Sequence, residues 1–223
     1  MRVPKVEHYS GKSASKVKQI HIEKPIIIPR LPVITTEKQK DKLIKTIEKL
    51  VRGSMEYKDL IKYLRNNINM DECEFFPNFK AGKRRGMIEI HHAPYDLYTI
   101  TWIVLERHEQ EIGYIDELDV AEEVMRLHYE GMVGLIPLSV TAHELVHDGK
   151  LVVPLNCVRG KFVQFTKDYY QYIENINKDV DIIGMLQENI ELTKKLTRKD
   201  LSILDVHYVY TDVDGCVLPK IVA

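Results

Sequence analysis

The sequence predicts a mixed α+β protein that is mostly helical, with a small strand–strand–helix centre. Most of the chain repeats apolar residues at helical spacing. Near the middle, residues 87–91 and 133–138 instead form short apolar runs bounded by glycine, which is typical of strands. The second run leads directly into a short helix-like segment that carries two histidines four residues apart. We therefore expect this centre to lie between an N-terminal helical hairpin and a C-terminal helical segment.

Composition bounds the class of protein. The chain has 223 residues, 44% of them hydrophobic and 29% charged, as in an ordinary soluble domain that buries a core. Its net charge of −1 excludes a global field that would attract nucleic acid, so such binding would need a local basic cluster. The three cysteines include no CxxC pair, which argues against a zinc knuckle or a disulfide scaffold. With no apolar leader or membrane-length run in view, we expect a cytoplasmic protein.

The N-terminal third divides into an arm and a helical hairpin. Residues 1–35 look extended, because three prolines surround an apolar run of three isoleucines that should pack against the protein's own core or a partner. Residues 36–70 form the predicted hairpin. Thr35 or Thr36 caps a helix that ends at Gly53, and a second helix follows over residues 55–66.

Residues 71–160 form the predicted central domain. A basic cluster precedes its first strand and is a candidate for phosphate contact: Lys80, Lys83, Arg84 and Arg85. A helical insertion at 95–130 follows, with helices expected over residues 94–110 and 120–129 and Trp102 as a core residue. His108 and His128 have no second ligand at metal spacing, so they are interpreted as ordinary surface or hydrogen-bonded histidines.

The C-terminal segment, residues 161–223, is again mostly helical. Apolar spacing predicts helices over residues 162–173 and 180–196, and alternation predicts a strand over 206–210. Residues 151–153 are expected to form a further strand or a packed extension.

Four histidines carry the chemistry. His91 and His92 end the first strand, and His143 and His147 lie one turn apart on the helix that Ser139 or Thr141 would cap. Three neutral imidazoles can hold a divalent ion and leave positions open for a substrate oxygen and water. A fourth imidazole, which titrates near neutral pH, could accept a proton from the attacking water. Phosphodiester hydrolysis is the reaction class that this pattern favours.

This arrangement resembles the HNH nucleases, with their ββα-metal (His-Me finger) fold, and its spacing is similar to the colicin-type branch. The residues that carry the resemblance are Arg85, Glu89, His91, His92, His143 and His147. It implies a DNA endonuclease with one divalent ion (Mg, Mn, Zn or Ni), held by His91, His143 and His147. The resemblance makes His92 the general base, Glu89 the residue that orients a histidine or Arg85, and Arg85 the contact to the scissile phosphate. Because many HNH proteins are carried by phages, it also suggests a phage protein in the host-cell cytoplasm.

The sequence departs from the HNH pattern in two ways. Gly134 stands where the family places an asparagine that helps to hold the base, and Tyr95 or Asp96 could replace it. The segment between His92 and Gly134 is also much longer than in small HNH domains. One alternative is therefore a non-catalytic HNH-like structural or nucleic-acid-binding subunit of a larger assembly, possibly a phage, with a protein partner on the N-terminal arm or the C-terminal helices. Another is a hydrolase of small phosphoesters.

Overall fold

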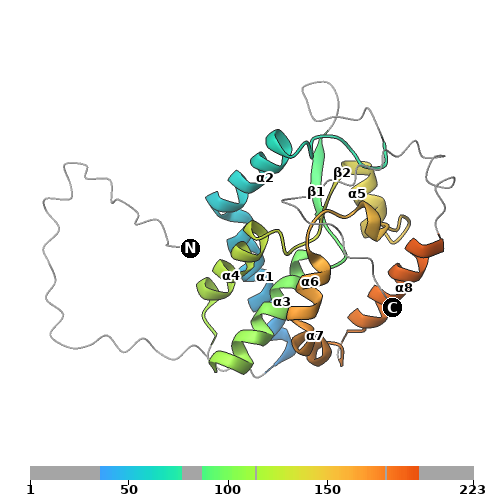
Figure 1. Cartoon of the computed structure of the whole chain (residues 1–223). Coiled ribbons are helices and arrows are strands. Elements are labelled where there is room, and N and C mark those ends of the chain that lie inside the picture. The colour runs from blue at the N-terminus through green and yellow to red at the C-terminus, as the bar shows by residue number, and fades with distance from the viewer. Residues whose placement is uncertain (1–35, 77–86, 114, 179, 196–223) are drawn as a thin grey trace, which may run out of the picture.

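The computed structural model describes residues 36–76, 87–113, 115–178 and 180–195 (Figure 1). The larger helices are α1 (Glu37–Gly53), α2 (Met55–Asn67), α3 (Leu97–Arg107), α4 (Glu117–Tyr129) and α8 (Ile182–Lys195). The shorter ones are α5 (Val140–His147), α6 (Phe162–Asp168) and α7 (Tyr170–Ile176). Two strands, β1 (Ile88–His92) and β2 (Leu135–Ser139), complete the regular structure together with a π-helical turn, η2 (His108–Ile112), and a 3-10 turn, η3 (Leu155–Cys157). The predicted α+β class, mostly helical, is confirmed.

The helical hairpin forms where its caps predict it. The Oγ1 atom of Thr36 accepts a hydrogen bond from the Gln39 amide at 3.3 Å and begins α1. Ser54 separates the two helices: its hydroxyl donates to the Val51 carbonyl at 2.8 Å and accepts from the Tyr57 amide at 3.0 Å. One serine therefore ends α1 and caps α2.

The two strands form an antiparallel pair that leads into α5. His91 lies opposite Ile136 and His92 opposite Leu135. Ser139 ends β2 and caps α5, because its Oγ accepts from the Ala142 amide at 3.2 Å. The chain thus places strand, strand and helix together in space, although 42 residues (93 through 134) separate β1 from β2.

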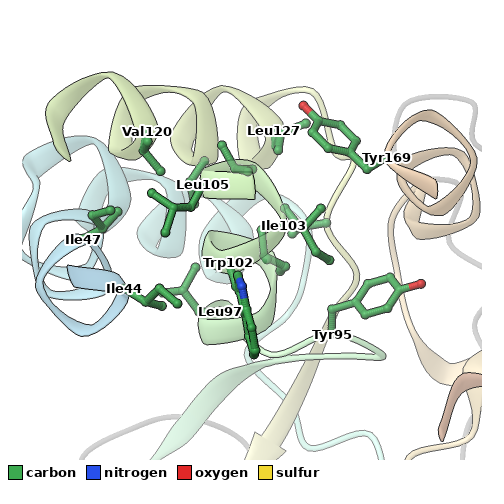
Figure 2. Close-up of a cluster of buried hydrophobic side chains, with 14 of the residues drawn as sticks. Ile44, Ile47, Tyr95, Leu97, Trp102, Ile103, Leu105, Val120, Leu127 and Tyr169 are labelled. Carbon is green, nitrogen blue, oxygen red and sulfur yellow. The ribbon is translucent and has the colours of Figure 1, made fainter. Parts of the chain in front are cut away.

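The main core is built around the predicted insertion. Apolar side chains of α3 and α4 pack with those of α1 and α7 in one cluster (Figure 2), including Ile44, Ile47, Leu97, Ile103, Leu105, Val120, Leu127 and Tyr169. Trp102 is part of this cluster, as predicted. The ranges 36–70, 71–160 and 161–223 all contribute to this core, so residues 95–130 form the centre of the protein.

Some predicted elements differ in the structure. The run over 162–173 is divided into α6 and α7, because the backbone of Tyr169 (φ −107°, ψ 12°) leaves the helical conformation between them. Of the two alternatives predicted for residues 151–153, the packed extension is confirmed and the strand is not, because Leu151 and Val153 pack into a second apolar cluster. The predicted arm 1–35, the basic cluster at 80–85 and the strand at 206–210 lie outside the described residues. No helix in the described part of the chain is long and apolar enough to cross a membrane.

Candidate metal centre

His91, His143 and His147 converge at the contact between β1 and α5. One nitrogen atom of each ring lies within 4.8 Å of the others, and these three are the only such group among the described histidines, cysteines and acidic residues. The ring of His91 meets those of His143 and His147 edge to face, with centroids 5.0 and 5.2 Å away. His91 is buried, His143 is partly buried and His147 is exposed, so the group opens to solvent from the α5 side. The three predicted ligands are therefore brought together.

The spacing of the two helical histidines fits a shared ion. The Nε2 atoms of His143 and His147 are 3.2 Å apart. Two nitrogens bound to one zinc ion at its usual bond length in a tetrahedron would be about 3.3 Å apart. The His143–His147 pair therefore has the separation expected for a shared divalent ion of the zinc type.

Glu89 fixes the orientation of His143. Its Oε2 atom lies 2.8 Å from His143 Nδ1, and it can do so because residues two apart on a strand point to the same face, here that of His91. Because the carboxylate accepts this hydrogen bond, Nδ1 carries the proton. The lone pair of Nε2 is then free to bind a metal ion. A carboxylate behind a ligating histidine fixes its tautomer and raises its basicity. The predicted role of Glu89 in orienting a histidine agrees with this contact.

The surroundings of His91 and His143 favour the neutral form of both rings. Burial lowers the pKa of His91 to about 4, and the neighbouring His143 and His147 act in the same direction. Burial also lowers the pKa of His143, partly opposed by the charge of Glu89. Neutral imidazoles are the form that binds a metal ion, so these two ligands need no deprotonation near neutral pH.

His92 lies apart from this group. Next to His91 on a strand, it points to the opposite face. There its Nε2 is 2.9 Å from Nε2 of His128, and its ring stacks on Tyr57 with centroids 6.4 Å apart. It is 5% exposed, and burial holds its pKa well below the usual range. The prediction of a general base beside the metal disagrees with this position, which makes His92 a core residue.

The partner of His92 was not predicted from the sequence. His128 was correctly interpreted as a hydrogen-bonded histidine: its Nδ1 donates to the Val124 carbonyl at 2.7 Å, which leaves Nε2 to accept from His92. His92 was predicted to be a base and was not linked to His128, yet the two rings hydrogen-bond to each other. His108, which also has no second ligand at metal spacing, is likewise buried and contacts Glu123.

The structure explains glycine at position 134. A Cβ atom on Gly134 would lie 1.9 Å from the Ala93 carbonyl oxygen and 2.7 Å from Val158. No side chain fits, so asparagine could not occupy this backbone. Neither suggested replacement serves the site: the Tyr95 hydroxyl bonds to Thr166 at 2.8 Å, and Asp96 caps α3.

The predicted roles of four basic residues remain predictions. Arg85, expected at the scissile phosphate, and Lys80, Lys83 and Arg84, expected on nucleic acid, lie outside the described residues.

The fold and this centre define an α+β protein with a histidine cluster between a two-stranded sheet and a short helix. Comparison with known families identifies it further. The chain belongs to the Bacteriophage G278-like virion protein family, whose sequence model matches residues 11–213. No curated protein and no solved structure matches it. The predicted phage association is thereby confirmed, and membership of a virion protein family supports protein partners within an assembly.

Proposed function

We propose that this virion protein contains an HNH-like ββα unit in which His91, His143 and His147 hold one divalent transition-metal ion, and that it acts as a metal-stabilised, non-catalytic subunit of the phage particle. The observation that carries the proposal is the convergence of three ligand nitrogens from β1 and α5. The virion family supports a role in an assembly.

Ligand chemistry favours zinc, nickel or cobalt over magnesium. Imidazole nitrogen suits the first three ions, whereas magnesium prefers oxygen ligands and retains its water. Among the described residues the only carboxylate that contacts the triad is that of Glu89, and it bonds to the distal nitrogen of a ligand.

The ion would add a link between β1 and α5 to the apolar packing of Ala142 and Val146 against the sheet. The helix α5 has eight residues, and a helix of that length is marginal without tertiary contacts. Its buried anchor is Ala142, a small side chain. A metal bridge from His91 to both α5 histidines would therefore stabilise the ββα unit directly.

Metal titration of the purified full chain tests this proposal. We expect one ion per chain by elemental analysis, and a cobalt spectrum typical of nitrogen ligation. The affinity for zinc should fall at least about 100-fold in His143→Ala, because one of three ligands is lost. The thermal midpoint of the wild type should rise with metal concentration, as binding to the native state alone requires.

A matched control is available on the same helix. Glu144 is exposed and adjacent to His143, so Glu144→Ala should bind zinc as the wild type does. Equal metal affinity in the two variants, or no bound ion in the wild type, would contradict the proposed centre.

A second candidate function is the HNH-type endonuclease, a hydrolase that cleaves DNA. Two features favour it: three protein ligands leave positions open on an ion, and His143 and His147 lie towards solvent. A bound divalent ion would stabilise the charge that develops on a phosphate. The position of His92 weighs against this candidate, because the base would have to be another group. Glu89 is the candidate for that base, because it lies on the same face of β1 as His91 and its side chain is 40% exposed.

Cleavage of supercoiled, nicked and single-stranded DNA in the presence of zinc, nickel, manganese or magnesium tests the second candidate. If it holds, nicking should require metal, and both His143→Ala and Glu89→Gln should slow it at least about 100-fold. His92→Gln should affect the rate only as far as it destabilises the fold, which a melting curve measures separately. A metal-loaded protein that cleaves no DNA would leave the structural role, and cleavage of only a small chromogenic phosphodiester would identify the small-phosphoester hydrolase.

A further inference from the structure

We propose that a basic groove on α2, separate from the histidine centre, binds the phosphate backbone of a nucleic acid strand. The groove, of about 490 Å³, lies between α2 and the end of α1. It is lined by Arg52, Tyr57, Lys58, Ile61, Lys62, Arg65 and Asn66.

Three of its cations form a stripe. Lys58, Lys62 and Arg65 have i, i+4 and i+7 spacing, so they share one face of α2 and span about 10 Å along the helix. Arg52 adds a fourth charge from the end of α1. None of the lining residues is acidic, and among the described residues the one ion pair made by these cations is a long one, 3.8 Å between Arg52 and Glu48.

Two of the cations are already held in place. The Lys58 Nζ atom donates to the Gly53 carbonyl at 3.0 Å, and Arg65 Nη2 donates to the Ile88 carbonyl at 2.6 Å. The Nε atom of Arg65 is buried and has no hydrogen-bond partner among the described residues. Donors that are ordered before binding lose less conformational entropy when an anion arrives. The groove is thus better prepared for anions than a set of freely rotating surface lysines.

The rest of the hairpin provides a contrast. On α1, Lys45 is paired with Asp41 at 2.9 Å, and Lys40 is paired with Glu106 at 3.1 Å. Lys42 and Lys49 are exposed but do not line the groove. Cations and acids alternate there, as on an ordinary solvated face. The groove differs from this face because four of its lining residues are cations and none is acidic.

A repeated anion fits this surface better than an acidic peptide. Cations on successive turns match the regular charge of a phosphate backbone, and the Asn66 amide adds a neutral donor of the kind that also contacts phosphates. A concave basic track that follows the backbone is also a feature of single-strand binding sites. Because the net charge of the chain is −1, any attraction to nucleic acid has to come from such a local site.

The groove and the histidine centre lie on different faces of β1. Leu60 and Leu64 of α2 pack with Ile90, and Tyr57 stacks on His92, whereas Glu89 and His91 face α5. Nucleic acid binding in the groove therefore needs no metal, and the inference stands independently of the proposed metal centre.

Fluorescence anisotropy with labelled single-stranded and duplex DNA, in EDTA and over a salt series, tests this inference. The full chain should bind at least one of the two. Lys58→Gln/Lys62→Gln should weaken binding about tenfold at low salt. It should also reduce the slope of log K against log salt by about 1.4 for single strands or about 1.8 for duplex.

The matched control removes two exposed lysines of the same hairpin outside the groove, Lys42→Gln/Lys49→Gln. It carries the same change in charge and should bind DNA nearly as the wild type does. Equal weakening in both double variants would overturn the proposal in favour of a diffuse field. The proposal also fails if the wild type binds no DNA in EDTA, or if it binds polyglutamate as tightly as DNA at equal salt.

Discussion

Replacement of Gly134 by asparagine is expected to unfold the protein, although asparagine is the residue that the HNH pattern places there. A Cβ atom at this position would lie 1.9 Å from the Ala93 carbonyl oxygen and 3.0 Å from its carbon. The close approach is part of the sheet, because the Ala93 amide donates to the Gly134 carbonyl at 3.1 Å. Relief of the clash would separate the two segments just beyond the strand pair and break that bond. We expect the free energy of unfolding to fall by more than about 4 kcal/mol, which is enough to abolish a cooperative transition.

Urea denaturation followed by circular dichroism measures this loss, and Gly53→Ala is the matched control. A Cβ atom at Gly53, the last residue of α1, has nothing within 4 Å. Alanine should therefore leave stability unchanged or raise it by up to about 1 kcal/mol. A folded Gly134→Asn variant with wild-type stability would show that this segment has another arrangement.

Glu123→Gln should lower the free energy of unfolding by about 3–5 kcal/mol at neutral pH. The substitution breaks a buried hydrogen-bond network that joins α3, α4 and Tyr169, the residue between α6 and α7. His108 Nε2 lies 2.8 Å from one carboxylate oxygen of Glu123. The Tyr169 hydroxyl donates to the other at 2.5 Å, and the Arg107 guanidinium also contacts it. The Glu123 side chain is 12% exposed, so water replaces few of these bonds. An amide would present hydrogens to groups that are themselves donors.

The network also predicts how stability depends on pH. Burial raises the pKa of Glu123, but hydrogen bonds from His108 and Tyr169 and the charge of Arg107 outweigh it and lower the pKa from 4.5 to about 2. A folded-state pKa below that of the unfolded chain stabilises the protein above the unfolded value, and this contribution is lost as pH falls through the folded one. Glu123 should thus contribute about 3 kcal/mol that disappears between about pH 4.5 and pH 2.

Urea denaturation at a series of pH values measures this contribution. The wild type should lose more stability than Glu123→Gln over that interval, so the two curves converge in acid. Glu109→Gln, at an exposed position near the same network, should follow the wild type. Parallel curves for wild type and Glu123→Gln would show that the carboxylate does not titrate as this network requires.

The parts of the fold that could be predicted from sequence depend on local chemistry. Thr36 and Ser139 cap the helices that follow them, and a single serine, Ser54, separates α1 from α2. The proposed ligands His143 and His147 are one helical turn apart, and that spacing alone placed both on one face. Strand alternation could also have indicated that His91 and His92 point in opposite directions. The sequence argument grouped them by residue type, and for this reason His92 was assigned a role beside the metal.

Features that depend on tertiary packing were not predictable in the same way. The contact of His92 with His128 joins residues 36 positions apart, and nothing in either local sequence indicates the other. The network of Glu123 likewise draws on three separate elements. The sequence around Gly134 does not indicate why glycine is needed there. The close approach of Ala93 that requires glycine appears only in the folded sheet.

The 42 residues between the two strands also bear on how the protein folds. Pairing of β1 with β2 closes a loop that contains α3 and α4, whereas a compact finger pairs its strands across a short loop. Closing a long segment costs chain entropy before the strand contacts repay it, which slows such pairings. We therefore expect His91 to meet His143 and His147 late in folding. The metal ion proposed for this site would then bind only chains whose helical core is already complete, and metal content would distinguish folded chains from incompletely folded ones.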